Sequence, residues 1–349
     1  MALELRTYSG DGDDLADLIV SSWQHVLKDT AWFPVWDRDF IRWKVMDPRV
    51  FDRDMIVAAY QDDRLIGCSV SLPCEFRIGD AAIKGSSCSF LSADPAYKRP
   101  GLAVRVIEEM RKRHIDGGYR ISLGVRNVAP GALAKKFWDG YMKRHPDEGD
   151  ILGRFKSWVH VFDGPAVARA SLGTWEAMEA RAGGVLPLGW TGARGCGQPC
   201  KPEEIARDLA IVAAGNPGVQ IEQLHSEATL SHALHHEYCF AVRHPTAEAL
   251  LAGYMIDWNG KSDVRVGFVD LVAGQAAPAD MAALIVYAAR QLRAKGAQMV
   301  VMMDQGAAPA EAFRRAAFVP VDPDVEYFVW YKDPTLAIPP GARCAVAFT

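Results

Sequence analysis

The fold of this chain is decided by the stretch Ser89-Phe90-Leu91-Ser92-Ala93-Asp94-Pro95-Ala96-Tyr97-Lys98-Arg99-Pro100-Gly101-Leu102-Ala103-Val104. Its apolar first part predicts a strand, Asp94-Pro95 predicts a turn, and the residues after Gly101 predict a helix. The first amides of a helix lack intrahelical partners, and the helix dipole adds positive potential there. Glycine at the helix start lets a ligand approach the backbone closely. The stretch therefore predicts a strand, a turn and a helix that together can bind a pyrophosphate.

The residues around this stretch predict strands and helices in a mixed order. In the first half we expect helices at residues 11–25, 101–114 and 132–142, and strands at residues 3–6, 55–60, 65–72, 84–93, 119–125 and 155–162. A polar spacer at residues 61–64 predicts a hairpin turn between two of the strands. Because several strands follow one another without helices, the order is not a run of βαβ units. It predicts an α/β fold of the α+β type, built on a mixed sheet.

The second half of the chain repeats part of this pattern. A shift of 178 residues without a gap aligns four identical pairs, Phe90 with Phe268, Pro100 with Pro278, Ile107 with Ile285 and Gly118 with Gly296. The same shift superimposes a strand, a turn, a helix, a glycine stop and a second strand, which indicates an internal duplication. Residues 164–200 are rich in Gly, Ala and Pro and predict a linker. We therefore expect domains at residues 1–163 and 201–349.

The segment Lys98-x-x-Gly101-x-Ala103, placed after a strand, resembles motif A of the GCN5-related N-acetyltransferase (GNAT) superfamily. The family pattern is Gln/Arg-x-x-Gly-x-Gly/Ala, so the first position keeps a cation. The resemblance covers about residues 3–163 and, more weakly, 200–332. It implies two tandem GNAT-like domains, each a central mixed β-sheet flanked by helices. It also implies an acyl-CoA-dependent N-acyltransferase, most simply an N-acetyltransferase, in which the amine attacks the thioester directly in a ternary complex.

The resemblance also implies the residues that bind acetyl-CoA or another acyl-CoA. They are Phe90, Leu91, Ser92, Ala93, Lys98, Arg99, Pro100, Gly101, Leu102, Ala103, Val104 and Asn127. Local charge supports a polyanionic ligand independently of the resemblance. Residues 98–144 contain twelve Lys and Arg against four Asp and Glu, although the whole chain has a net charge of -4. We expect this basic segment to attract the phosphates of the cofactor.

The second copy lacks the features of the first. In the gap-free register, Lys98 is replaced by Ala276 and Gly101 by Ala279, and Asp280 places a carboxylate at the helix start. A carboxylate there satisfies the positive helix end and repels a pyrophosphate. We therefore expect a degenerate second domain without catalysis of its own, which packs on the first domain and helps to shape the acceptor site.

Catalytic groups are harder to assign from the sequence. The family often places a carboxylate or histidine on the strand before the turn, whereas this strand offers Ser86, Ser87, Cys88 and Ser89. The family's tyrosine, which protonates the departing thiolate, is replaced by Lys136. We expect Tyr141 and Glu75 as substitutes, or else a hydroxyl, a water chain or a group from the other half. Trp32 and Trp36 lie in the segment that covers the acceptor in such folds, so we expect them to contact the substrate.

Several alternatives remain open at this stage. The donor could be an acyl carrier protein, whose acidic surface would dock on the basic segment, or the chain could be a non-catalytic pseudo-acetyltransferase that binds CoA. A tRNA-dependent aminoacyl transferase is disfavoured by the net negative charge. The acceptor is expected to be a small-molecule or peptide amine, and the sequence does not fix the oligomeric state.

Composition limits the other classes of partner. The net charge excludes a global attraction to nucleic acid or to an anionic membrane, and no apolar stretch approaches the ~20 residues of a spanning helix. Seven scattered cysteines indicate reduced thiols and a cytoplasmic protein. His232 and His236 have the i,i+4 spacing of metal ligands, but no second ligand pair is evident, so we expect no metal.

Overall fold

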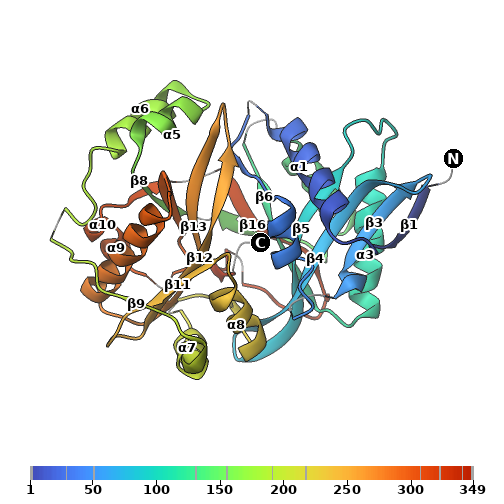
Figure 1. The fold of residues 1–349 in the computed structure, drawn as a ribbon. Coiled ribbons are helices and arrows are strands. Elements are labelled where there is room, and N and C mark those ends of the chain that lie inside the picture. Colours follow the sequence, from blue (N-terminus) through green and yellow to red (C-terminus); the bar gives the residue numbers. More distant parts are fainter. Residues whose placement is uncertain are drawn as a thin grey trace.

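The computed structural model describes residues 3–28, 30–49, 52–129, 132–154, 156–190, 192–216, 218–306, 308–321, 324–339 and 341–346. Two twisted sheets lie side by side, with helices on their outer faces and further helices between them (Figure 1). This arrangement confirms the predicted α/β class with two mixed sheets flanked by helices.

The first sheet is built mainly from the N-terminal half of the chain. Its strand order is β1 (Leu3–Thr7), β3 (Ile56–Gln61), β4 (Arg64–Ile78), β5 (Ala81–Ala93), β6 (Ile121–Asn127), β16 (Val325–Lys332) and β7 (Asp150–Arg154). Two short strands extend it beside β4, namely β10 (Ile221–Leu224) and β17 (Cys344–Ala345). Along the main strand order, only β5 and β6 pair in parallel. The predicted hairpin turn joins β3 to β4, with Asp62 and Asp63 at positive φ.

The second sheet has a matching order. It runs β15 (Val319–Val321), β8 (Ser157–Val161), β14 (Met299–Met303), β13 (Asp263–Gly274), β12 (Ala249–Asn259), β11 (Cys239–Arg243) and β9 (Gln198–Pro199), with β2 (Phe33–Pro34) paired to β12. Here β13 and β14 form the parallel pair. The parallel pair therefore occupies the same position in the strand order of both sheets.

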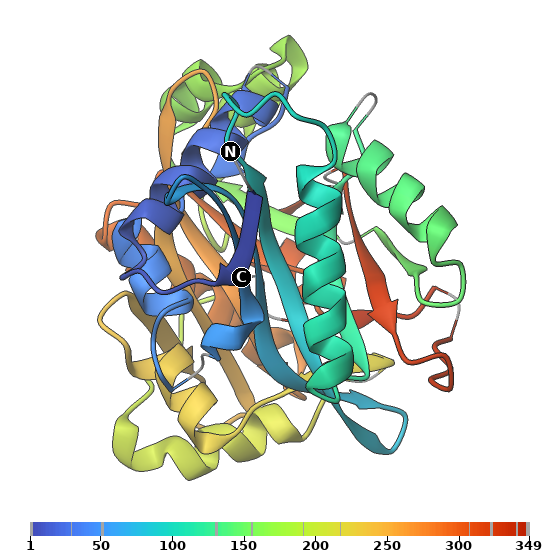
Figure 2. The same cartoon turned by 90° about the vertical axis from the view of Figure 1, so that its right-hand side faces the viewer.

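The helices form layers around and between the sheets. They are α1 (Asp13–Leu27), α2 (Arg38–Lys44), α3 (Leu102–Asp116), α4 (Leu133–Arg144), α5 (Gly164–Ala170), α6 (Thr174–Gly183), α7 (Ile205–Ala213), α8 (Glu227–His235), α9 (Pro278–Ala294) and α10 (Ala310–Arg315), with 3-10 turns at Arg53–Met55 and Pro202–Glu204. Helices α3 and α4 cover the outer face of the first sheet (Figure 2), and α9 and α10 cover that of the second. None of the described helices is long and apolar enough to cross a membrane.

The two sheets exchange their closing strands. Strand β8 follows β7 in the chain, yet it pairs with β14 and β15 of the second sheet. Strand β16 follows β15, yet it pairs with β6 and β7 of the first sheet. Each sheet is therefore completed by a strand from the other half of the chain, and the sheets cross the expected limit at residue 163.

The duplication is visible in the order of the elements, but the gap-free register holds only in part. A shift of 178 residues aligns α3 and β6 with α9 and β14. The strand before each helix does not follow the 178-residue shift. Ile121 corresponds to Met299 in this register, but Ile121 pairs with Gly85 of β5, whereas Met299 pairs with Val266 of β13. The shorter connection at residues 275–277, compared with 94–101, accounts for this displacement.

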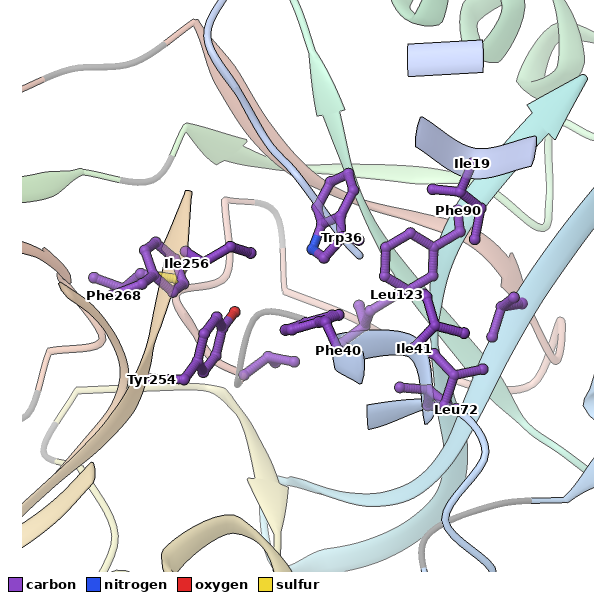
Figure 3. Packing of buried hydrophobic residues seen from close by; sticks show 14 of the residues in the cluster. Ile19, Trp36, Phe40, Ile41, Leu72, Phe90, Leu123, Tyr254, Ile256 and Phe268 are labelled. Carbon is purple, nitrogen blue, oxygen red and sulfur yellow. The ribbon is translucent and has the colours of Figure 1, made fainter. Parts of the chain in front are cut away.

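Helix α2 and the residues just before it place aromatic side chains between the two sheets. Asp37 caps the helix by accepting a hydrogen bond from the Phe40 amide at 2.8 Å. Phe40 packs on Tyr254 of the second sheet with ring centroids 5.4 Å apart, and Trp36 packs on Phe90 of the first at 4.9 Å. Figure 3 shows Trp36 and Phe40 between these two sets of side chains. The aromatic seam therefore joins both sheets into one core.

A buried ion pair accompanies the seam. The Lys44 ammonium at the end of α2 lies 3.5 Å from the Asp270 carboxylate on β13. Burial raises the pKa of Asp270, and the Lys44 charge opposes that rise. The ion pair thus links the N-terminal half to the second sheet by charge as well as by apolar packing.

The strand exchange makes a specific prediction about fragments. Residues 1–163 alone lack β16, so β6 and β7 lose the strand that joins them, and β8 has no sheet to enter. We expect this fragment to aggregate when expressed alone and to become soluble when co-expressed with residues 164–349. Size-exclusion chromatography of both preparations measures this. A fragment 1–163 that is monomeric and cooperatively folded by itself would show the prediction to be wrong.

Candidate functional site

The candidate site lies at a gap between two strands of the first sheet. Strands β5 and β6 pair from Gly85–Ile121 to Cys88–Gly124, and beyond this point they separate although both continue. Below the gap, the Ser86 hydroxyl lies 2.7 Å from the Ser122 hydroxyl and 2.7 Å from Nε2 of His114 on α3. This buried polar contact holds the paired ends together, so the separation starts at a fixed place.

A β-bulge explains why β5 turns away from β6. The pairing of β5 with β4 shifts register between Cys68–Ser92 and Val70–Ser89. Phe90 lies in the bulge with φ 58, a left-handed conformation that is uncommon for a bulky residue. Such local strain persists when packing enforces it, and here the Phe90 ring packs on Trp36. Past the bulge, the backbone groups of β5 that face the gap have no neighbouring strand.

A cavity of about 320 Å³ occupies this gap. On one side of the sheet it is lined by Ala103 of α3 and by Leu133, Ala134, Phe137 and Trp138 of α4. On the other side it is lined by Ser22, Trp23, Val26 and Leu27 of α1 and by Trp36, Tyr327 and Val346. Since side chains from both helical layers line one cavity, the cavity passes through the sheet.

The turn at residues 94–101 connects two residues that line the cavity, Ala93 before it and Ala103 after it, and we call this side of the cavity its mouth. Asp94 shapes the turn by accepting a hydrogen bond from the Ala96 amide at 2.8 Å and by pairing with Arg64. Gly101 caps α3 with φ 87, and a Cβ there would meet no atom within 4 Å. The first turn of α3 carries no acidic residue. Its amides and dipole therefore offer an open positive site for an anion.

The basic segment is less available than its composition indicates. Five of its cations pair with carboxylates, namely Arg111, Arg113, Arg120, Arg126 and Lys135. Arg126 is buried between Asp139 and Glu326 and joins β6, α4 and the exchanged strand β16. Lys98, Arg99, Arg105 and Lys136 stay exposed near the turn and have no acidic partner in the described part of the chain. The charge available to a ligand is therefore concentrated at the mouth.

The structure brings most of the expected cofactor residues together. Phe90, Leu91, Ser92, Ala93, Ala103 and Asn127 line the cavity. Lys98, Arg99, Pro100, Gly101, Leu102 and Val104 form the turn and the first turn of α3 without lining the cavity itself. The Ala93 amide is already engaged, since it donates to the Ser22 hydroxyl at 3.2 Å. Of the two expected substrate residues, Trp36 lines the cavity and Trp32 does not.

The two expected catalytic residues lie elsewhere. Tyr141 on α4 is fully buried, and its ring centroid lies 4.6 Å from that of His145. It does not line the cavity. Burial also holds the pKa of its hydroxyl well above the usual range. Glu75 is exposed near the far end of β4, where it pairs with Leu224. The geometry therefore gives no support to a catalytic role for either residue.

The sequence analysis missed Tyr327, which lies nearly two hundred residues after most of the other residues that line the cavity. Strand exchange places it opposite Val125 of β6, in the cavity wall. Burial holds the pKa of its hydroxyl well above the usual range, so the hydroxyl stays protonated at neutral pH. No Asp, Glu or His is among the described residues that line the cavity. Only the pairing of β16 could have revealed Tyr327, and no local pattern signals that pairing.

The corresponding gap in the second sheet is closed. Gln305, which the 178-residue shift aligns with Asn127, accepts a hydrogen bond from the Val272 amide at 3.0 Å. It also donates to the carbonyls of Asp270 at 2.5 Å and Val346 at 3.0 Å. Asn127 instead turns back to accept from the Ala129 amide at 2.8 Å. The second half therefore ties its diverging strands together where the first half leaves an opening.

His232 and His236, the pair with metal-ligand spacing, lie beside the aromatic seam. No group of three or more His, Cys, Asp or Glu suited to a metal occurs among the described residues. His232 is buried in α8, and the ring of His236 stacks on that of Trp43 with centroids 5.4 Å apart. The seven cysteines, all described, are free. The two histidines thus contribute to packing around Trp43.

Solved structures of acyltransferases have a fold similar to that of this chain. The chain is similar to Saccharomyces cerevisiae N-myristoyltransferase with bound myristoyl-CoA, with a TM-score of 0.72 and 11% identity over 100% of this chain and 86% of that one. A structure of the same enzyme with myristoyl-CoA and inhibitors gives a TM-score of 0.71 and 13% identity over 95% and 80% of the chains. A GCN5-related N-acetyltransferase from Kribbella flavida gives 0.50 and 12% over 94% and 71%.

The sequence itself has no match among family models or curated proteins. At 11–13% identity, the structural likeness describes the fold and not the reaction. The similarity nevertheless extends over the whole chain and includes both halves. The chain therefore has the tandem GNAT fold, with a second half whose equivalent site is closed.

Proposed function

We propose that this chain is an N-acyltransferase that transfers an acyl group from coenzyme A to an amine, by direct attack in a ternary complex. The observation that carries the proposal is the passage through the first sheet beside the positive end of α3. Because residues from both sides of the sheet line this cavity, a thioester could approach from one side and an amine from the other. The fold neighbour solved with bound myristoyl-CoA supports an acyl-CoA donor.

The donor would bind along the bulged strand. The open amides of the α3 start and the exposed Lys98 and Arg99 would hold the pyrophosphate. The arm of the cofactor would then lie between β5 and β6, where the two strands no longer pair. Ala103 would allow close approach, and Asn127 would border the arm at the end of β6. These roles follow the expectation from the sequence for the cofactor residues.

The chemistry in the passage needs few charged groups. The neutral amine attacks the thioester carbonyl, a tetrahedral intermediate forms, and the carbon–sulfur bond breaks to release the thiolate. The amine loses one proton and the thiolate gains one, so protons balance overall. We propose that the Tyr327 hydroxyl donates a hydrogen bond to the departing sulfur, in place of the family tyrosine that Lys136 replaces. Trp36 borders the reacting group on the seam side.

The acyl group need not be acetyl. Trp23, Val26 and Leu27 give the seam side of the passage an apolar wall, which suits an acyl chain longer than two carbons. Rates with acetyl-CoA and myristoyl-CoA as alternative donors decide between the two. An acyl carrier protein as donor stays a proposal of the same class, because the free cations lie around the mouth.

A non-catalytic CoA-binding protein is the second candidate. The absence of Asp, Glu and His from the described cavity lining favours it, since most proton transfers in enzymes use these groups. Release of free thiol from acyl-CoA in the presence of a panel of amines separates the candidates. An enzyme releases thiol in proportion to the amine, whereas a binding protein does not.

The geometry predicts one cofactor site, at the start of α3. Gly101→Glu adds a charge at this helix start, so we expect CoA affinity to fall by at least about a hundredfold through repulsion and blockage. Gly101→Asn keeps a residue that tolerates positive φ without adding charge, so its loss should be much smaller. Isothermal titration calorimetry with CoA measures both affinities and the stoichiometry.

The second half supplies the matched control for this experiment. Ala279 is exposed in the first turn of α9, the counterpart of α3, and Ala279→Glu makes the same chemical change there. We expect this variant to bind CoA like the wild type. Undiminished binding by Gly101→Glu, or an equal loss in Ala279→Glu, would rule out the assignment.

Tyr327→Phe tests the proposed role of the exchanged strand in the reaction. The variant keeps the ring and removes the hydroxyl, so we expect kcat to fall about 10²-fold while the KM for acyl-CoA changes little. Tyr331→Phe on the same strand is the control, because Tyr331 is buried against the α3 side and does not line the cavity. Equal kcat values for the two variants would remove Tyr327 from the mechanism.

A further inference from the structure

Exposed apolar side chains gather at the end of the molecule that carries the cavity mouth. On α6, Trp175 is 77% exposed and Met178 is 54% exposed, and their i,i+3 spacing places them on one face. At the mouth itself, Leu133 at the start of α4 is 60% exposed and Val26 near the end of α1 is 39% exposed. Exposed apolar residues that cluster in this way commonly mark an interaction surface.

The elements that carry these residues lie at one end of the fold. Figures 1 and 2 both show the α5–α6 hairpin, the C-terminal end of α1 and the turn before α3 at the same end of the molecule, and Figure 2 adds the start of α4. Contacts link the hairpin to the α1 side, since the Lys261 amide at the β12–β13 tip donates to the Ala170 carbonyl at 2.8 Å. A Cβ at the neighbouring Gly260 would lie 3.5 Å from Trp32.

Unpaired cations surround these apolar residues. Five cations at this end are exposed and have no acidic partner in the described residues. They are Lys28 after α1, Lys98 and Arg99 in the turn before α3, Lys136 in the first turn of α4, and Lys261 at the tip of the β12–β13 hairpin. Of the acids at this end, Asp94 and Asp139 are neutralised by Arg64 and by Lys135 with Arg126. Glu176 and Glu179 of α6 and Asp263 at the hairpin tip are exposed without a cation partner among the described residues, but Arg169 of α5 and Arg181 of α6 are exposed without an acidic partner as well, so cations outnumber acids. This end is therefore basic, although the chain as a whole has a net charge of -4.

We propose that this end docks on an anionic lipid surface, with Trp175 and Met178 entering the interface and the surrounding lysines contacting lipid headgroups. Aromatic and long apolar side chains partition into the boundary between headgroups and acyl chains, and each nearby cation strengthens binding to an anionic membrane. The net charge argues against a global attraction to membranes, but electrostatic attraction acts over only ~10 Å at physiological salt, so the local charge decides.

The composition of the surface favours lipid over an acidic protein partner. An acidic carrier protein would need the cations and a compact contact at the mouth, but it would not need an exposed tryptophan and methionine on α6, which does not line the cavity. A planar lipid surface contacts the mouth and α6 together. Docking would also point the cavity mouth at the bilayer, where apolar donors or acceptors partition. The inference does not depend on the proposed acyl transfer.

Vesicle co-sedimentation of the full chain tests the proposal. The probes are phosphatidylcholine vesicles with and without about one third phosphatidylglycerol. We expect binding to the anionic vesicles only, weakened as salt rises from about 0.1 M to about 0.5 M. Trp175→Asp with Met178→Asp should lower the partition coefficient at least about tenfold, because the change removes apolar contact and adds repulsion.

The control is Trp190→Asp, which changes a tryptophan of similar exposure at 66%. Its neighbour Gly189 donates a hydrogen bond to the Ala316 carbonyl at the end of α10, which lies below the α5–α6 hairpin in Figure 1. This variant should bind vesicles like the wild type, and calorimetry with CoA should be unchanged for both variants. Lack of wild-type binding to anionic vesicles would overturn the proposal, as would an equal loss in the Trp190 variant. Binding only to an acidic carrier protein would overturn it as well. None of these results would affect the proposed acyltransferase activity.

Discussion

Strand β16 completes the first sheet although it comes from the second half of the chain, and β8 does the reverse for the second sheet. Each exchanged strand is the second from one end of its sheet's main order, so it has hydrogen-bonded neighbours on both sides. Loss of either strand would leave unpaired backbone groups inside a sheet, which is costly. The aromatic seam of α2 and the Lys44–Asp270 ion pair add to this linkage. The two halves consequently form one folding unit in spite of their duplicated order.

This linkage gives the second half a structural role in the first sheet. The first sheet is open between β5 and β6 beyond Cys88–Gly124, and the opening removes hydrogen bonds from its centre. Strand β16 supports β6 on its other side, so the opening has one firm wall, and it carries Tyr327 into that wall. The second half closes its own gap with Gln305 and shortens the turn that would hold a pyrophosphate. One half thus provides the passage, and the other stabilises it.

The sequence predicted the features that depend on local pattern. The strand, turn and helix at residues 89–104 follow from apolar spacing and from Gly101, and the structure has them with Gly101 at positive φ. Long-range pairing was beyond such patterns. The closing strand near residues 157–161 was correctly expected as a strand, but nothing in its residues states which sheet it enters. For the same reason no pattern predicts that Tyr327 lines the cavity, and helix spacing alone does not reveal that Tyr141 faces the packed side of α4. The basic segment was overestimated because ion pairs such as Arg111–Glu148 form only in the folded chain.

The central claim is that one open passage, in the first sheet only, accepts an acyl-CoA. Native mass spectrometry of the full chain with a moderate excess of acetyl-CoA or myristoyl-CoA tests it most directly, because it counts bound molecules per chain. The account predicts a single bound acyl-CoA. Two bound molecules of equal affinity would contradict the closure of the second gap by Gln305, and no bound molecule with either donor would contradict the passage as a cofactor site.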